Sequence, residues 1–367
     1  MKSKRRKKRR KNSQRKNLIV MIISILIIIG VIIYLYNNDK SDLIKDILPV
    51  EKKELKIVDE NSNKRPIAVM YDNNVGNNNH AGLQDAYITY EIIVEGGLTR
   101  IMAIFKDKDV SLIGPVRSSR HYFLDYALES DAIYTHFGWS PYAENDIKAL
   151  HVNNINGLYD DNPFWREKTI AAPHNVFTTT QKIYEEATKK GYNTETTNWK
   201  LLKYETDEVK LNKPIETKTV VNEETGKKEK KEILDPNLLT ANTIKIPYSY
   251  NQNRSYEYDL DRGVYLRFMN GKAHLEKTTN EQLNYKNIII EKVTNRTLDS
   301  YGRQDLDTTG TGEGYYITNG YALPIKWTKN SRYDKTIYTY EDGSKVKIND
   351  GNTFIQIMPS TYNITIE

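Results

Sequence analysis

The first 64 residues place one long apolar segment between two polar ones. Residues 18–36 form an uncharged run of 19 residues, about the length that crosses a bilayer as a helix. Residues 2–16 contain eleven Lys or Arg and no acidic residue, which is typical of a cytoplasmic flank. The pattern predicts a basic cytoplasmic tail over 1–17, a single transmembrane helix over 18–36, a polar stalk over 37–64, and the rest of the chain outside the cell.

Residues 65–195 alternate between strand-like and helix-like patterns. The strand-like runs are IAVMY (67–71), YITYEIIVE (87–95), TRIMAIF (99–105) and AIYTHF (132–137). The helix-like segments are RSSRHYFLDYALES (117–130), SPYAENDIKAL (140–150) and TTTQKIYEEATKKG (178–191). Ser140 and either Thr178 or Thr179 are placed to cap the second and third helices. The alternation predicts an α/β or α+β N-terminal domain.

The pattern changes after residue 195. Residues 196–239 are highly charged, and TKTVVNEETGKKEKKEIL within them predicts a solvated hairpin. Residues 240–367 contain short strand-like runs between Gly, Asp and Asn turns, which predicts a smaller, mostly-β C-terminal domain. We expect the two halves to pack separately, with a site at their junction. Arg267 and His274 are candidates to contribute to that site, although an arginine on a strand is more often a surface residue.

Charge excludes a nucleic-acid function. The whole chain carries +6, but the eleven cations of the tail account for this value. The remaining 43 Lys and Arg face 48 Asp and Glu, which gives −5 and leaves no basic face for nucleic acid. The chain contains no cysteine, so no disulfide stabilises the external part.

Three polar clusters stand at junctions that lead into predicted helices: GPVRSSRH (114–121), HFGWSP (136–141) and APHNVFTT (172–179). Helix N-termini present free N–H groups and a partial positive charge, and arginine adds planar donors that suit phosphate or carboxylate. Each junction alone is an ordinary helix cap, but three in one domain indicate a shared anionic site. The candidate ligand-binding residues are Arg100, Arg117, Ser118, Arg120, His121, His136, Ser140, His174 and Asn175.

These segments also carry a resemblance to a known family. The ordered motifs are RPIAVMYDN, YEIIVEGGLTRIMAIF, IGPVRSSRHYF, IYTHFGWSP, FWREKTIAAPHNVFT, YLRFMNGKAHLE, GRQDLDTTGTGEGYYITNG and GNTFIQIMP. Between about Arg65 and Pro359 the chain resembles the YerB family of bacterial envelope lipoproteins. The resemblance implies two domains of unknown function and an envelope location, and it supplies no reaction. The lipid-modified cysteine of the lipoprotein members is missing here, so we expect the transmembrane helix to serve as the anchor.

An enzyme remains an alternative. Asp72, Glu91 and Glu95 could form a carboxylate set of the glycosidase kind, with one acid and one base or nucleophile. Alternatively, each carboxylate pairs with Arg100, Arg117 or Arg120 to organise the fold, and we consider this interpretation the simpler one.

Other catalytic patterns are incomplete. Ser118 and His121 are three residues apart, but no G-x-S-x-G surrounds the serine. His136 and His174 lack the spacing of a metal motif, so we expect no metal and no cofactor. The TGTGEG segment (309–314) lacks the lysine of a P-loop and is interpreted as a turn.

Two classes of function therefore remain. The first is a membrane-anchored envelope protein that binds an anionic wall component or a partner protein through an Arg- and His-lined cleft. The second is an extracytoplasmic hydrolase or transferase that acts on a sugar or phosphodiester polymer of the cell wall. We favour the first, because no complete catalytic constellation can be assembled from the sequence.

Overall fold

The structure is a computed structural model that describes residues 21–22, 53–74, 76, 78–160, 162–221 and 226–367. Residues Glu54–Glu367 form one compact unit. The expected tail (1–17), transmembrane helix (18–36) and most of the stalk (37–64) lie outside the described residues, apart from Met21 and Ile22, which are helical. Within the described part of the chain, no helix has the length and apolar character needed to cross a membrane.

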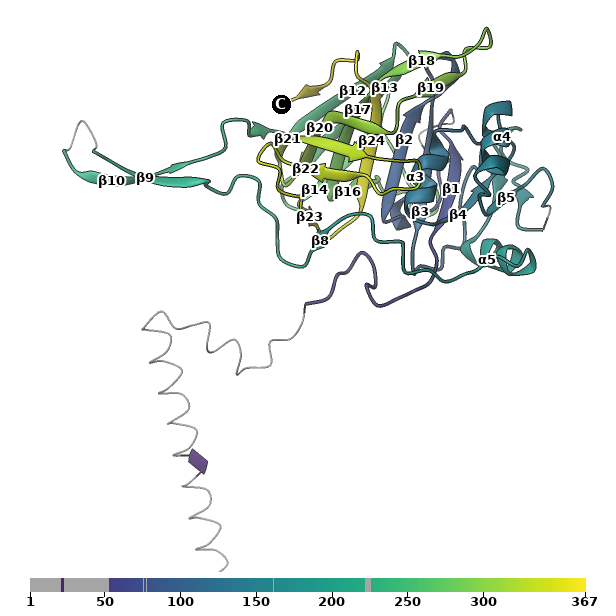
Figure 1. The fold of residues 1–367 in the computed structure, drawn as a ribbon, viewed down its shortest axis with the longest axis horizontal. Coiled ribbons are helices and arrows are strands. Elements are labelled where there is room, and N and C mark those ends of the chain that lie inside the picture. Colours follow the sequence, from purple (N-terminus) through teal and green to yellow (C-terminus); the bar gives the residue numbers. More distant parts are fainter. Residues whose placement is uncertain (1–20, 23–52, 75, 77, 161, 222–225) are drawn as a thin grey trace, which may run out of the picture. The chain divides into compact units, whose positions relative to one another are not determined.

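A large mixed sheet runs through the unit (Figure 1). Its order is β11-β21-β20-β17-β24-β2-β3-β1-β4-β5, with β22 paired to β21, which makes 11 strands. The strands are β1 (Ile67–Asp72), β2 (Ile88–Ile93), β3 (Thr99–Phe105), β4 (Ile133–His136), β5 (Asn154–Asn156), β11 (Leu239–Thr240), β17 (Asn287–Val293), β20 (Gly310–Thr318), β21 (Tyr321–Lys329), β22 (Ile337–Thr339) and β24 (Thr353–Pro359).

A second sheet has six strands, in the order β15-β14-β13-β12-β25 with β16 paired to β14. These strands are β12 (Thr243–Ser249), β13 (Gln252–Asp259), β14 (Val264–Met269), β15 (Lys272–Ala273), β16 (Asn284–Tyr285) and β25 (Thr365–Ile366). The remaining pairs are β6 (Trp165–Arg166) with β7 (Val176–Phe177), β8 (Tyr204–Glu205) with β23 (Ile348–Asn349), β9 (Glu216–Val221) with β10 (Lys228–Ile233), and β18 (Asn295–Thr297) with β19 (Gln304–Leu306).

The helices are short and lie at the β1–β4–β5 end of the large sheet (Figure 1). They are α3 (Phe123–Glu129), α4 (Pro141–Ala149) and α5 (Thr180–Lys189), with 3₁₀ turns η1 (Leu83–Asp85) and η2 (Glu95–Gly97). Two predicted caps are confirmed, because Ser140 accepts the Ala143 N–H at 3.2 Å and Thr179 accepts the Lys182 N–H at 3.0 Å. The first predicted helix is shorter than expected, since it begins only at Phe123.

Differences in burial explain why the strands of the two sheets have different hydrophobic patterns in the sequence. Strands β1, β2, β3 and β24 are buried at every position, so they appear as continuous apolar runs. Strands β12 and β14 alternate between buried and more exposed positions, so one face of the second sheet is buried. Tyr248 on β12 donates to the Gln356 side chain on β24 at 2.7 Å, which places that buried face against the large sheet.

The predicted fold class is wrong. The described molecule is largely β, and residues 65–195 do not form the separate α/β or α+β domain that the sequence predicts. The helical patterns in that region give only three helices of seven, nine and ten residues. Strands β1 to β5 of that region belong to a sheet whose other strands come from the second half of the chain.

The halves are also not packed separately. Strand β24 lies between β17 of the second half and β2 of the first, and it is parallel to both. The register pairs Glu91 with Gln356 across this junction. Because hydrogen bonds cross from one half to the other within a single sheet, the two halves share one core.

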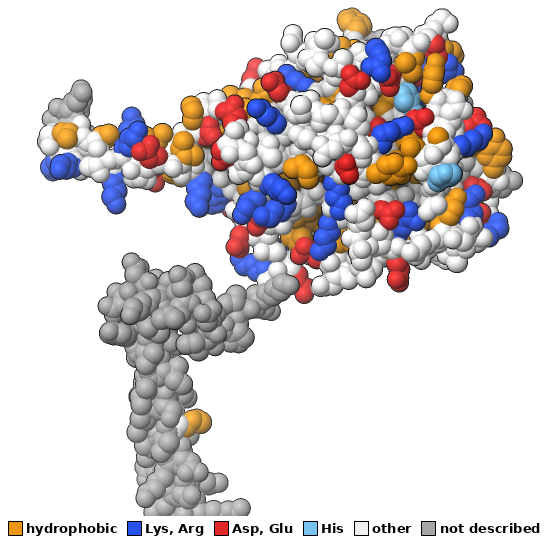
Figure 2. All heavy atoms as spheres, in the orientation of Figure 1, with side chains coloured by type: hydrophobic (Ala, Val, Ile, Leu, Met, Phe, Trp, Pro, Cys, Tyr) orange, Lys and Arg blue, Asp and Glu red, His pale blue; other side chains and the backbone are white. Residues whose placement is uncertain are grey.

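The charged connector contains the hairpin that the sequence indicates. Strands β9 and β10 pair with each other and with no other strand of the described chain. Nearly all their side chains are exposed, and in Figure 2 Lys and Arg side chains stand along this hairpin. The hairpin therefore contributes little to the core.

Candidate functional site

The three predicted polar clusters lie side by side at the end of β1. Val116 forms a bridge with Tyr71 on β1 and donates its N–H to the Val176 carbonyl at 2.7 Å. Ser119 forms a parallel bridge with Trp139. Segments separated by up to 60 residues in sequence are therefore joined by backbone contacts at one place.

Asp72, the last residue of β1, is the centre of this place. Its carboxylate Oδ2 lies 2.6 Å from His174 Nδ1 and 3.1 Å from Arg117 Nε, and its Oδ1 accepts the Asn74 N–H at 2.9 Å. The Asp72 side chain is 4% exposed, whereas those of Arg117 and His174 are 27% and 30% exposed. A buried carboxylate thus holds a guanidinium and an imidazole at the surface.

Arg100 completes the group, which we call the Asp72 cluster (Asp72, Arg100, Arg117 and His174). Arg100 on β3 is the register partner of Asp72 on β1, so both side chains lie on the same face of the sheet. Its Nη1 donates to the Ser118 carbonyl. Burial, and then the charge of Arg120, lower the pKa of Arg100 to about 10. Within the described chain, Arg100 forms no ion pair with a carboxylate.

Arg120 differs from Arg100 because its charge is neutralised. Its Nε and Nη2 donate to the two carboxylate oxygens of Glu95 at 2.6 and 2.8 Å, and its Nη1 donates to the Ser119 carbonyl at 2.8 Å. Despite burial, the Arg120 hydrogen bond and charge hold the pKa of Glu95 below its usual value. Glu95 and Arg120 therefore organise the fold beside the Asp72 cluster.

Glu91 faces the other half of the molecule. It is fully buried, with Oε1 2.7 Å from Arg254 Nε and Oε2 2.5 Å from Arg267 Nη2. Asn73 and Thr99 also donate to Oε1, at 2.7 and 2.6 Å. Burial opposes ionisation, yet Arg254 and then Arg267 hold the pKa of Glu91 at about 2.

This arrangement does not form a glycosidase-like carboxylate set. Glu91 has no solvent contact, and Glu95 is bidentate to Arg120. Asp72 alone of the three carboxylates holds partners whose side chains are more than a quarter exposed. The expectation that Glu91 pairs with an arginine is met by second-half residues, and not by Arg100 or Arg117.

Ser118 and His121 do not act as a pair. His121 Nε2 lies 2.8 Å from Asp305 Oδ1 on β19, and its Nδ1 is buried without a partner in the described residues. Because α3 begins at Phe123, no helix N-terminus stands at Ser118. Ser118 contributes its carbonyl to Arg100.

His136, Ser140 and Asn175 have local structural contacts. His136 is buried, its Nδ1 donates to the Gly138 carbonyl at 2.8 Å, and burial lowers its pKa to about 4. Ser140 caps α4. Asn175 accepts from Arg166 Nη1 at 2.8 Å and donates to a backbone carbonyl. These three residues shape the segments that carry the Asp72 cluster.

Sequence reasoning missed two residues, His80 and Arg254. His80 is buried between Asp72 and His274, with Nε2 2.7 Å from the Asp72 carbonyl. Arg254 and Tyr256 are two residues apart on β13, and both are buried on the same face of the strand. An arginine in phase with a tyrosine on an alternating strand is a signal that could have identified Arg254. His80 lies in an Asn-rich loop and gives no such signal.

The TGTGEG segment is not a turn between strands. Most of it forms the start of β20, where Gly314 approaches the Ile290 carbonyl so closely that a Cβ would lie 1.9 Å from its oxygen. The glycines there serve close strand packing. Among the described residues, no group of three or more His, Asp or Glu is arranged to hold a metal ion.

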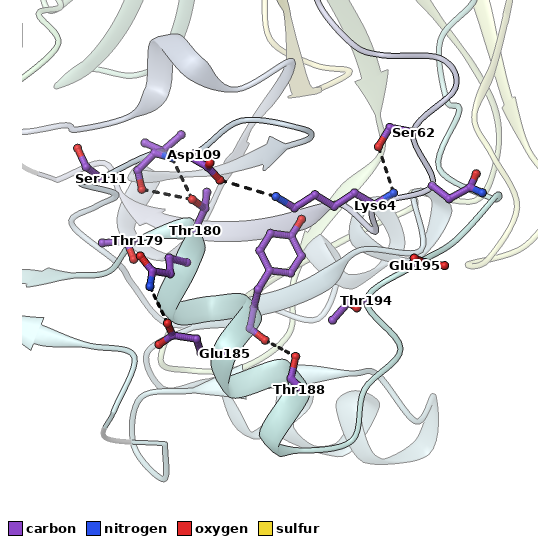
Figure 3. Close-up of a pocket in the computed structure, with 14 residues that line it drawn as sticks. Ser62, Lys64, Asp109, Ser111, Thr179, Thr180, Glu185, Thr188, Thr194 and Glu195 are labelled. Carbon is purple, nitrogen blue, oxygen red and sulfur yellow. Dashed lines mark hydrogen bonds and ion pairs between the residues drawn. The ribbon is translucent and has the colours of Figure 1, made fainter.

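One hollow lies along α5, and none of the residues that line it belongs to the Asp72 cluster (Figure 3). It has a volume of about 1100 Å³. Lys64 reaches toward Asp109 at 3.7 Å, and Thr180 accepts the Val110 N–H at 2.9 Å. Because these polar side chains bind their own chain, the hollow is less suited to a ligand than its size suggests.

Comparisons with known proteins bear on the whole chain. Residues 54–193 match "Protein of unknown function (DUF3048) N-terminal domain" and residues 244–355 match "Protein of unknown function (DUF3048) C-terminal domain". The chain is 29% identical over 326 residues to "Putative lipoprotein YerB" of Bacillus subtilis (strain 168), which covers 88% of each chain. A crystal structure of YerB protein from Bacillus subtilis aligns with a TM-score of 0.70 and 26% identity, covering 86% of this chain and 97% of that one. These matches confirm the resemblance inferred from the motifs.

Proposed function

This chain belongs to the two-domain YerB-like family of DUF3048 proteins, and we propose that it is an extracytoplasmic protein that binds an anionic component of the cell envelope. The description of its relative as a lipoprotein supports the extracytoplasmic placement. The binding site is the Asp72 cluster. Its ligand carries phosphate or carboxylate groups, which are the anions that arginine recognises with planar donors.

One observation carries this proposal: near Arg100 the guanidinium groups outnumber the carboxylates, and within the described chain Arg100 forms no ion pair of its own, although the charge of Glu95 still acts on it. Three guanidinium groups, those of Arg100, Arg117 and Arg120, lie close enough for their charges to interact. Two carboxylates face them, since Asp72 pairs with Arg117 and Glu95 pairs with Arg120. A buried cation without a direct carboxylate partner is costly unless an anion approaches it.

The partly exposed residues provide the contacts for that anion. Within the described chain, Arg117 uses only Nε and His174 uses only Nδ1 in side-chain bonds. The terminal nitrogens of Arg117 and His174 Nε2 are therefore available to a ligand. The buried charge of Arg100 strengthens the attraction from beneath, where water screens it little.

Arg100→Gln separates binding from folding. Glutamine retains a donor for the Ser118 carbonyl but removes a buried charge that has no ion-pair partner, so the free energy of unfolding should stay within about 1 kcal/mol or rise. Retention on purified anionic wall polymer should fall about tenfold, because one positive charge beneath the bound anion is lost. Thermal unfolding and polymer co-sedimentation measure the two effects.

Arg262→Gln is the matched control, because Arg262 is exposed and its side chain forms no ion pair within the described chain. It should change neither property. A strongly destabilised Arg100→Gln with unchanged polymer retention would mean that Arg100 serves the fold alone. Co-sedimentation with a poly-glutamate and with a polyphosphate distinguishes carboxylate from phosphate ligands.

A second candidate is the hydrolysis of a sugar or phosphodiester polymer. It is favoured by the Asp72–His174 contact, which fixes one imidazole nitrogen on a carboxylate and leaves Nε2 free to accept a proton from water. His174→Gln should then abolish release of fragments from the polymer while retention of the polymer persists. If wild type releases no fragments from any wall polymer, binding alone remains.

A further inference from the structure

A hydrogen-bonded chain of buried side chains links the second half of the molecule to the Asp72 cluster. Arg267 Nε lies 3.1 Å from His274 Nδ1, and His274 Nε2 lies 2.8 Å from His80 Nδ1. His80 Nε2 in turn lies 2.7 Å from the carbonyl oxygen of Asp72. Arg267, His274 and His80 have no exposed surface.

The proton positions along this chain follow from its two ends. A guanidinium can only donate, so His274 Nδ1 accepts and the ring proton is on Nε2. A carbonyl can only accept, so His80 also carries its proton on Nε2 and accepts from His274 at Nδ1. Burial lowers the pKa of His80 to about 4 and that of His274 well below its usual value, in keeping with two neutral rings.

The Arg267 end of the chain is firmly held. Its Nη2 lies 2.5 Å from Glu91 Oε2, its Nη1 donates to the Tyr256 hydroxyl, and its guanidinium carbon lies 4.3 Å from the centre of the Phe354 ring. These contacts leave the guanidinium a single orientation, from which His274 and then His80 are aligned.

At the other end of the chain, the orientation of the Asp72 peptide sets the positions of two surface side chains. Asp72 accepts the His80 hydrogen bond at its backbone carbonyl, and it holds His174 and Arg117 through its carboxylate. A tilt of this peptide moves both surface groups. By contrast, the Asp72 N–H donates to the Pro115 carbonyl at 2.8 Å, a contact made within the first half.

We propose that His80 and His274 are positioning residues for the Asp72 cluster. Through them the second half of the chain sets the orientation of Asp72, and with it the affinity of the site for anions. This inference rests on the proposed function. It accounts for why a buried imidazole pair lies between an ion cluster and a surface site when apolar residues could have filled the same space.

Two substitutions at one position test the proposal. In His274→Gln the amide oxygen can accept from Arg267 and the amide nitrogen can donate to His80, so the chain is preserved. His274→Phe keeps the bulk of the ring but breaks the chain and leaves Arg267 Nε without its acceptor. Tripolyphosphate affinity, measured by calorimetry on the full chain, should fall about tenfold in His274→Phe and by less than about threefold in His274→Gln. Equal affinities in two folded variants would overturn the proposal.

A spectroscopic measurement on the wild type keeps the test decisive if His274→Phe does not fold. Nitrogen-15 spectra of the imidazoles at pH 7 should show His80 and His274 as neutral rings protonated on Nε2. In His274→Gln the His174 signal should match that of the wild type, because Asp72 keeps its orientation. A ring protonated on Nδ1, or a charged ring at pH 7, would contradict the chain.

The two proposals fail in different ways. If no anion binds to the wild type while both rings carry the expected protons, the proposed function fails and the chain stands as described. If anions bind but His274→Phe and His274→Gln behave alike, the positioning role fails and the binding site stands.

Discussion

At the scale of single residues, the buried charges hold the two halves together. Glu91 from the first half receives hydrogen bonds from Arg254 and Arg267 of the second, and all three side chains are fully buried. Burying such a cluster costs desolvation free energy, so the cluster adds little net stability while it is complete. Removing one member, however, leaves a buried charge without its partner and destabilises the fold. Because one carboxylate balances two guanidinium groups here, neutralising that carboxylate should strongly lower the stability of the fold.

Glu91→Gln should therefore destabilise the protein strongly. The substitution leaves two buried guanidinium groups without a counter-ion, for which about 3 to 5 kcal/mol of unfolding free energy is expected to be lost. Urea unfolding at pH 7 measures the change, and Glu257→Gln on the exposed side of β13 is the control. A loss below about 1 kcal/mol would contradict the role given to Glu91.

The pKa of Glu291 is raised, whereas that of Glu91 is lowered, and the raised value predicts that stability falls as the pH increases. Burial raises its pKa from 4.5 to about 7, although Tyr338 and Tyr126 donate to it. The folded state therefore binds a proton that the unfolded state has released, and this stabilisation is fully present below pH 4.5 and lost as the pH rises through 7. It amounts to about 3 kcal/mol.

Comparing wild type with Glu291→Gln isolates this effect. From pH 5 to pH 8 the wild type should lose stability relative to the variant, because only the wild type must ionise a buried carboxyl. Urea midpoints at the two pH values provide the measurement. Parallel pH profiles of the two proteins would show that Glu291 does not titrate in this range.

Much of the candidate site could be predicted from the sequence, but its connections could not. Arg117 and His174 stand in motifs that predict an anion site, and Asp72 was predicted only as one of three carboxylates; the structure brings these residues together. Arg267 was named as a candidate for a site between the two halves, although its strand position favoured the surface. It is instead buried, because the face of the second sheet that carries it packs against Glu91, a contact between residues 176 positions apart.

At the scale of elements, helix boundaries that depend on local side-chain caps were predicted correctly, whereas a boundary that depends on tertiary contacts was not. The caps of α4 and α5 follow from Ser140 and Thr179 alone, because side-chain caps act within three residues. The start of α3 was misplaced because residues 116–119 are held extended by bridges to β1 and to Trp139. Tertiary pairing decided that segment against its helical spacing.

The two charged hairpins should respond differently to removal. Replacing β9–β10 by a short Gly/Ser linker should change the unfolding free energy by less than about 0.5 kcal/mol, because its side chains are almost all exposed. Replacing β18–β19 should cost more, since Leu306 is buried and Asp305 binds His121. Thermal unfolding compares the two deletions, and equal losses would contradict the isolation of β9–β10.

At the scale of the whole molecule, one sheet unites the two family domains. Strand β24 enters between β17 and β2, so each half completes the core of the other. The sequence could not show this, because a parallel neighbour some 265 residues away leaves no local pattern. Composition correctly indicated a β-rich second half, but the fold class failed because the sheet crosses the boundary between the halves.

Neither half should fold alone. A fragment of residues 54–193 exposes the edge of β2 and leaves Glu91 without Arg254 and Arg267. We expect broad, non-cooperative thermal unfolding of this fragment, whereas residues 54–367 should unfold in one transition. Calorimetry distinguishes the two cases. Cooperative unfolding of the short fragment would mean that its part of the sheet is self-sufficient.

The central claim is that the Asp72 cluster binds an anion. Its most direct test is a crystal structure of the wild-type protein grown with tripolyphosphate. We predict phosphate oxygens within hydrogen-bond distance of the terminal nitrogens of Arg117 and of His174 Nε2, with Arg100 beneath them. Anion density elsewhere on the protein, with the Asp72 cluster occupied only by water, would contradict the claim.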